Sequence, residues 1–138
     1  MKKILIVDDS LFMRMVLKNI FSKESFAPEK NRSNSSKKAL AKRYKILEAS
    51  SDSEAMEQYN KEKPDLVFLD IIMPGGEEEG IKILKKMIKT DSKAKIVMIS
   101  AVGQDAIIEE CKKYGAKDYI VKPFDEARVA KTARNFLQ

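Results

Sequence analysis

The sequence predicts an α/β fold, a three-layer sandwich with a parallel β-sheet between two layers of helices. The length of 138 residues suffices for one domain and is short for two. Apolar residues make up 43% of the chain and charged residues 35%, a balance that supports a folded core and argues against disorder. Short apolar runs also alternate with helical patterns along the chain, which is typical of a parallel sheet with right-handed crossovers.

Five runs have the length and composition of strands. Four are rich in Ile, Val, Leu and Phe, as strands buried on both faces are, and one mixes apolar with polar residues, as an edge strand does. We expect strands over 3–7, 45–49, 65–69, 95–99 and 118–121. No apolar run approaches the roughly 20 residues that span a bilayer, so we expect no insertion into a membrane.

Helical spacing of apolar residues separates these strands. In the first helix, Phe12, Val16 and Ile20 recur every four residues, which puts them on one face. We expect helices over 11–23, 53–61, 80–90, 104–114 and 125–137.

Positive charge is concentrated in one segment. The chain has 27 basic and 21 acidic residues and a net charge of +6. Residues 25–45 hold seven of the basic residues and one of the acidic ones, so the rest of the chain balances at 20 of each. Because no basic stripe runs over the remainder, we expect no nucleic-acid partner. The stretch 25–44 is also long for a connection within a domain. Because it joins the end of a helix to the start of a strand, we expect it at the edge of the sheet where the strands begin, either as a solvated loop or as a docking surface for an acidic partner.

The numbers of cysteine and histidine residues limit the kinds of site that the chain can form. The single cysteine, Cys111, excludes an internal disulfide and favours a reduced, cytoplasmic protein. The chain contains no His, which excludes a His-based zinc site and a Ser–His or Cys–His nucleophile pair. Chemistry must therefore depend on carboxylates, Lys, Ser or Thr, and a hard metal ion.

Polar side chains stand where four of the predicted strands end. They are Asp8, Asp9 and Ser10, then Asp70, Ser100 and Lys122. Taken singly, each has a simpler explanation, such as a helix cap for Asp9 or Ser10. Because the carboxyl ends of parallel strands meet at one edge of the sheet, however, we expect these side chains to gather there. Three carboxylates without compensation would repel one another.

A divalent cation and one lysine would relieve that repulsion. Mg²⁺ fits best, because it prefers oxygen ligands, retains several waters and binds phosphate oxygens. A carboxylate beside Mg²⁺ can attack a phosphoryl group and form an aspartyl phosphate. The metal and Lys122 would then neutralise the phosphoryl oxygens, and Ser100 would donate a hydrogen bond to them.

The motifs that carry this chemistry resemble the response-regulator receiver domain. They are Asp8-Asp9-Ser10, Asp70-Ile71-Ile72-Met73-Pro74, Ser100-Ala101 and Lys122-Pro123-Phe124. The runs 12–15 and 115–124 look most like stand-alone chemotaxis regulators of the CheY type. The resemblance covers the chain apart from 25–44. It implies a single receiver domain over 1–138 with an extra basic segment, and a flavodoxin-like, five-stranded sheet in the order 2-1-3-4-5.

The resemblance also implies roles for the acidic residues. Asp70 would be the phosphoacceptor. Asp9 and Asp70, with the backbone carbonyl of Ile72, would bind Mg²⁺ directly, and Asp8 would hold it through water. The Lys122–Pro123 bond would be cis, an isomer that only an X–Pro bond adopts at low cost.

A conformational switch is implied as well. Ser100 would move toward the phosphoryl group and Tyr119 would turn inward, which would remodel the face formed by residues 104–138. We expect slow loss of the phosphoryl group, because Ile72 and Val102, the side chains beside the path of the hydrolytic water, are apolar and β-branched.

These inferences make the chain a signalling phosphoacceptor rather than an enzyme acting on other substrates. Its partners would be a histidine kinase as phosphodonor, a target such as a flagellar motor component, and a phosphatase, and we expect a monomer. The alternative is a phosphorelay intermediate that passes the phosphoryl group to a His of another protein. A haloacid-dehalogenase-like phosphatase would need Asp where Ile72 stands, and a flavodoxin-like electron carrier would need a phosphate loop where Asp8 and Asp9 stand. Because only a short stretch follows Lys122, we expect no output domain.

Three features depart from the family pattern. The loop after Asp70 is two residues longer than usual and contains Glu77-Glu78-Glu79, Asp52 replaces a common Gly, and the segment 25–44 has no counterpart. These departures do not affect the residues of the expected chemistry, but they leave the identity of the partner protein undetermined.

Overall fold

The computed structural model describes residues 1–23 and 44–138. Its centre is a parallel sheet of five strands in the order β2-β1-β3-β4-β5, which confirms the predicted fold and strand order. The strands are β1 (Lys2–Val7), β2 (Tyr44–Ala49), β3 (Leu66–Leu69), β4 (Ile96–Ser100) and β5 (Asp118–Val121). The expected basic segment 25–44 lies outside the described residues, apart from Tyr44, which begins β2.

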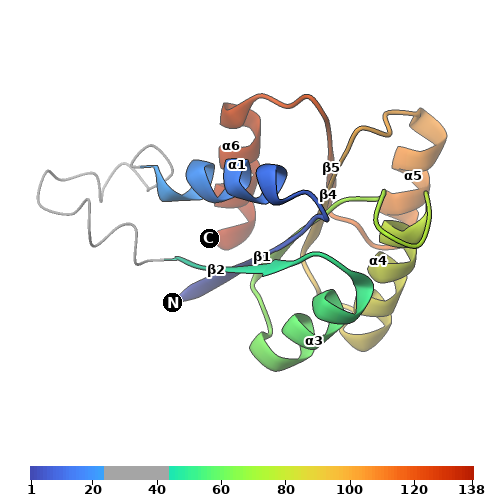
Figure 1. Ribbon diagram of the computed structural model, residues 1–138, viewed down its shortest axis with the longest axis horizontal. Helices are drawn as coiled ribbons and strands as arrows, with labels where there is room; N and C mark the ends of the chain where they lie inside the picture. Colours follow the sequence, from blue (N-terminus) through green and yellow to red (C-terminus); the bar gives the residue numbers. More distant parts are fainter. Residues whose placement is uncertain (24–43) are drawn as a thin grey trace, which may run out of the picture.

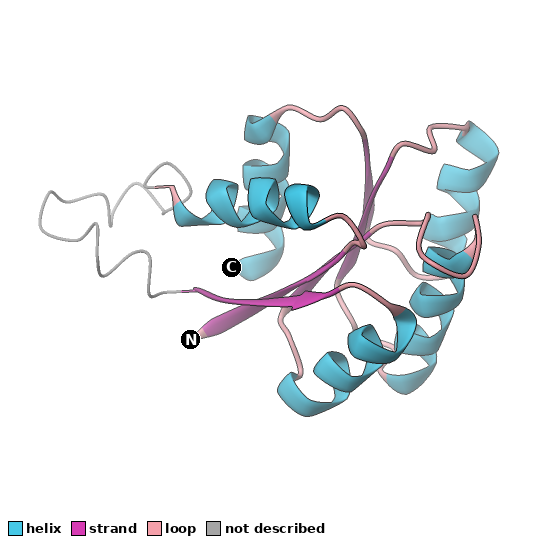
Figure 2. Ribbon diagram, viewed as in Figure 1, coloured by secondary structure: helices cyan, strands magenta, loops and turns pink. Residues whose placement is uncertain are grey.

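Helices cover both faces of the sheet (Figures 1 and 2). The helices α1 (Leu11–Ser22) and α6 (Glu126–Leu137) lie on one face. The other face carries α3 (Asp52–Glu62), α4 (Glu79–Thr90) and α5 (Asp105–Lys113). Within the described residues, none of the helices is both long enough and apolar enough to cross a membrane.

The interior strand β1 is buried on both faces because its side chains alternate between two cores. Leu5 and Val7 pack with the layer of α3, α4 and α5. Ile4 and Ile6 pack with the layer of α1 and α6. All four side chains are at most 1% exposed, which is why residues 4–7 are all apolar.

The helix α1 differs from its predicted face at the first turn. Its buried residues are Leu17, Ile20 and Phe21, whereas Phe12 is 72% exposed. The predicted stripe of Phe12, Val16 and Ile20 is therefore wrong at its first member. The physical reason is the helix face: Met13, Leu17 and Ile20 pack against the core, and Phe12 stands to one side of that face.

Candidate functional site

Three carboxylates meet at the carboxyl edge of the sheet. Asp8 and Asp9 follow β1, Asp70 follows β3, and each offers a carboxylate oxygen within 4.8 Å of those of the other two. Asp8 is 3% exposed and Asp70 7%, while Asp9 is exposed to solvent. The cluster therefore has two buried carboxylates and one that solvent reaches.

Lys122, which follows β5, supplies the opposite charge. Its Nζ lies 2.9 Å from Oδ2 of Asp8 and 3.1 Å from Oδ2 of Asp70. Burial alone would lower the pKa of Lys122, but the hydrogen bonds and negative charges of Asp8 and Asp70 outweigh it and raise that pKa above its usual value. The side chain is thus held as an ammonium ion between two buried carboxylates. The Lys122–Pro123 bond is cis.

Each buried carboxylate is also fixed by its own loop. Oδ1 of Asp8 accepts a hydrogen bond from the backbone N–H of Ser10 at 2.9 Å. Oδ1 of Asp70 accepts one from the N–H of Ile72 at 3.2 Å. Both carboxylates therefore keep one oxygen on the local backbone and turn the other toward Lys122, so their orientation is set before any ligand arrives.

Ser100 and Tyr119 both contact the residue Val102. Ser100 is fully buried at the end of β4, and its Oγ accepts a hydrogen bond from the Val102 N–H at 3.3 Å. The Tyr119 hydroxyl donates to the Val102 carbonyl, and the side chain is 6% exposed, so the ring points inward. Burial raises the pKa of Tyr119 to about 12, which keeps the hydroxyl protonated as a donor.

Metal binding at this cluster is chemically reasonable. The cluster offers only oxygen ligands, which suit hard divalent cations such as Mg²⁺. The three carboxylates carry three negative charges and Lys122 supplies one positive charge, so a divalent cation would neutralise the remainder.

An arginine brace behind the cluster was missed by the sequence analysis. Arg14 donates from Nη1 to the Asp8 carbonyl at 2.7 Å and from Nε to Oε1 of Glu48 at 3.1 Å. Lys18 donates to Oε2 of Glu48 at 3.1 Å. Burial would raise the pKa of Glu48, but the hydrogen bonds and charges of Lys18 and Arg14 lower it overall. The available signal was the position of Arg14, one helical turn after the cap residue Ser10.

Gly80 is a second residue that the sequence analysis did not connect with the site. A Cβ at this position would lie 2.0 Å from the carbonyl oxygen of Asp70 and 2.4 Å from Cα of Ile71. The N–H of Gly80 donates to the Ile71 carbonyl at 2.7 Å. The first turn of α4 is thus pressed against the backbone of Asp70, which only glycine permits. Its signal was a glycine at the start of a helical pattern.

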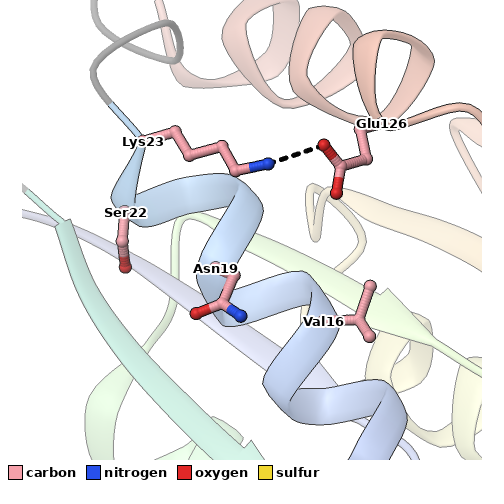
Figure 3. A pocket seen from close by; sticks show the side chains of 5 residues that line it. All are labelled: Val16, Asn19, Ser22, Lys23 and Glu126. Carbon is pink, nitrogen blue, oxygen red and sulfur yellow. Dashed lines mark hydrogen bonds and ion pairs between the residues drawn. The ribbon is translucent and has the colours of Figure 1, made fainter.

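A separate pocket of about 350 Å³ lies between α1 and α6 (Figure 3). Its lining residues are Val16, Asn19, Ser22, Lys23 and Glu126. Nζ of Lys23 lies 2.7 Å from Oε2 of Glu126, so the two charges neutralise each other. None of these side chains belongs to the acidic cluster, which remains the candidate site.

Known proteins match both the sequence and the fold. The family description "response regulator receiver domain" matches residues 29–134. The chemotaxis protein CheY of Thermotoga maritima is 43% identical, over 93% of this chain and 91% of its own length. The sporulation initiation phosphotransferase F of Bacillus subtilis is 32% identical, over 99% of this chain and 94% of its own length.

A solved structure shows the same architecture. The crystal structure of the CheX–CheY–BeF₃–Mg²⁺ complex from Borrelia burgdorferi contains a chain that is 30% identical and has a TM-score of 0.77. The match covers 99% of this chain and 90% of that chain. Since the family match spans most of the sequence and the relatives align over nearly all of it, the chain belongs to the response regulator receiver domain family of two-component signalling.

Proposed function

We propose that this chain is a phosphorylation switch in which Asp70 accepts a phosphoryl group from a histidine kinase. The observation that carries the proposal is the buried Asp70 carboxylate, which lies 3.1 Å from Nζ of Lys122 in a cluster with Asp8 and Asp9. A carboxylate oxygen of Asp70 attacks the phosphorus, and the bond from phosphorus to the donor's imidazole nitrogen breaks. The electron pair of that bond stays with the imidazole, so no base on this chain is required.

Mg²⁺ is the proposed cofactor. Asp9, Asp70 and the carbonyl of Ile72 would bind it directly, and Asp8 would hold it through water. When bound, Mg²⁺ neutralises charge on the phosphoryl oxygens. Lys122 contributes a second positive charge to those oxygens, and Ser100 donates a hydrogen bond to one of them.

In the proposed switch, the backbone of Val102 connects Ser100 with Tyr119. Ser100 Oγ accepts from the N–H of Val102 and Tyr119 donates to its carbonyl, so both residues hold the same short stretch of backbone. If Ser100 turns toward the phosphoryl group, the Val102 N–H loses its acceptor and the loop before α5 moves. Tyr119 already points inward, so the expected inward turn is not needed, and its hydroxyl would follow the Val102 carbonyl. The face formed by residues 104–138, which includes α5, β5 and α6, would then change its affinity for a target.

The exposed apolar start of α1 supports contact with a phosphodonor close to Asp70. Leu11 is 62% exposed, Phe12 72% and Met15 53%. Apolar side chains gathered on a surface are typical of protein–protein contacts. These residues stand on the helix that begins directly after Asp8 and Asp9.

Chemotaxis is the proposed pathway, because the CheY proteins of Thermotoga maritima and Bacillus subtilis are 43% and 40% identical to the chain. The target would be a component such as one of the flagellar motor, with a phosphatase as a further partner and the protein acting as a cytoplasmic monomer. The second candidate is a phosphorelay intermediate, favoured by the identity of 32% with sporulation initiation phosphotransferase F. Return of the phosphoryl group from Asp70 to a His-containing phosphotransferase would distinguish the relay.

The test is phosphorylation by acetyl phosphate with Mg²⁺, followed by phosphate-affinity gel electrophoresis. We expect Asp70→Asn to abolish labelling, because an amide is not a nucleophile here. The matched control, Asp105→Asn, alters an exposed carboxylate on α5 and should be labelled like the wild type. Labelling of Asp70→Asn to the wild-type level would refute the assignment. Pull-downs with and without beryllofluoride and Mg²⁺ would then identify partners that prefer the activated state.

A further inference from the structure

A pocket beside the site has apolar walls and an acidic rim. Its volume is about 300 Å³, and it lies between the loop after β3 and the start of α5. Ile71 and Ile81 form buried parts of the lining, with 2% and 4% exposure. Ile72 is 44% exposed, and Val102 and Ile107 are partly buried. Within the part of the chain that the structure describes, the aliphatic lining of the pocket is therefore partly open to solvent.

The polar residues of the rim are Glu77, Glu78 and Gln104, all exposed. Among the residues that the structure describes, no Lys or Arg lines the pocket. Across residues 1–23 and 44–138, neither Glu77 nor Glu78 has an ion-pair partner, whereas Glu79 lies 3.9 Å from Nζ of Lys82. Two uncompensated carboxylates beside an apolar pocket would attract a cationic group.

The backbone holds this acidic loop in place. The N–H of Gly76 donates to the Met73 carbonyl at 3.2 Å, and Gly80 donates to the Ile71 carbonyl at 2.7 Å. Gly80 has no space for a Cβ against the backbone of Asp70. Since the loop is anchored on both sides of Glu77 and Glu78, the backbone of these two residues is held beside the pocket.

We propose that this pocket binds a short segment of a partner protein in which an aliphatic side chain is flanked by Lys or Arg. The aliphatic group would enter between Ile72, Val102 and Ile107, and the cations would pair with Glu77 and Glu78. This surface lies on the side of α5 that faces α4. Its acidic part belongs to the loop between β3 and α4.

Occupancy of the pocket would also affect the phosphoryl group, and this second part rests on the proposed function. Ile72 and Val102 line the pocket and also stand beside the expected path of the hydrolytic water. A bound segment would cover both side chains and exclude water, so the aspartyl phosphate would last longer.

Binding is tested with the full-length, ¹⁵N-labelled protein and an acetylated, amidated peptide of sequence Lys-Lys-Ile-Leu-Lys-Lys. We expect amide shifts to concentrate at residues 71–81 and 102–107, and the affinity to fall as salt is added. The double variant Glu77→Gln/Glu78→Gln should weaken binding roughly fivefold, because two surface ion pairs are lost. The control Glu57→Gln/Glu109→Gln changes the net charge equally, at exposed positions outside the pocket, and should leave the affinity unchanged.

Several results would overturn the proposal. The first is the absence of peptide binding, and the second is amide shifts centred outside residues 71–81 and 102–107. The third is an equal loss of peptide affinity in both double variants, and the fourth is unchanged affinity when Ser-Ser replaces Ile-Leu in the peptide. Self-association of the protein alone that Glu77→Gln/Glu78→Gln abolishes would assign the pocket to a second copy instead. If the peptide binds as expected but does not lengthen the lifetime of the phosphoryl group, the docking surface stands and the water path near Ile72 and Val102 is wrong.

Discussion

Replacing Lys122 with Met tests how charge is balanced in the acidic cluster. Methionine keeps an unbranched side chain of similar length but removes the ammonium. The cation lies 2.9 and 3.1 Å from two carboxylates that are 4% and 9% exposed in their side chains. At an effective dielectric constant of about 20, each such pair is worth about 5 kcal/mol before desolvation is subtracted.

Desolvation of the ammonium offsets much of that attraction, because the Lys122 side chain is only 16% exposed. Removing one partner of a buried ion pair nevertheless costs roughly 3–5 kcal/mol, since the remaining charge is left without compensation. We therefore expect Lys122→Met to lower the free energy of unfolding by about 3 kcal/mol in the absence of metal. A divalent cation would replace the lost positive charge, so Mg²⁺ should stabilise the variant more than the wild type.

The assay is urea unfolding followed by circular dichroism, in EDTA and in Mg²⁺, with Lys93→Met as the control at an exposed lysine. The control should change the free energy of unfolding by less than about 0.5 kcal/mol. The reasoning is refuted if Lys122→Met loses no more stability than the control. It is also refuted if Mg²⁺ stabilises the wild type more than the variant.

Three other variants test other parts of the site. The double variant Ile72→Asn/Val102→Glu should lose its phosphoryl group about tenfold faster than the wild type, equivalent to about 1.4 kcal/mol in the barrier. The reason is that polar side chains can hydrogen-bond the hydrolytic water. A rate equal to that of the wild type would mean that these two residues do not control access of this water to the aspartyl phosphate. Gly80→Ala should lower the free energy of unfolding by about 2 kcal/mol or more in urea titrations, because its Cβ overlaps backbone, and a neutral effect would contradict the close packing of α4. Tyr119→Phe should change the alkaline stability profile. The pKa of Tyr119 is raised from 10.0 to about 12 in the fold, so its contribution is present below about pH 10 and is lost toward pH 12. The wild type should thus lose about 2 kcal/mol more than the variant over that interval, and parallel profiles would show that the hydroxyl is not buried as described.

The fold was predictable because four of its five strands contain short apolar runs and the fifth has the mixed pattern of an edge strand. Several strand ends differ by one residue from the prediction, at positions where polar residues flank the apolar run. Ser100, for example, ends the apolar run of β4 but still pairs with Val121 of β5. The misplaced face at Phe12 has another cause, because α1 carries two adjacent apolar stripes and their spacing does not show which one packs on the sheet.

The meeting of the acidic residues was also predictable, because parallel strands bring their carboxyl ends to one edge. The brace of Arg14 and Glu48 was not, since those residues are separated by 34 positions and meet only through tertiary packing. The same holds for Gly80, whose need to lack a side chain appears only when α4 is seen against the backbone of Asp70.

Chemical mapping of the phosphorylated residue tests the central proposal most directly. The wild-type protein is treated with acetyl phosphate and Mg²⁺, reduced with borohydride, digested and sequenced by mass spectrometry. Reduction converts an aspartyl phosphate to homoserine, so the modified position is read without any substitution. We predict homoserine at position 70, dependent on both acetyl phosphate and Mg²⁺. Homoserine at position 8 or 9, or none at position 70, would contradict the assignment of Asp70 as the phosphoacceptor.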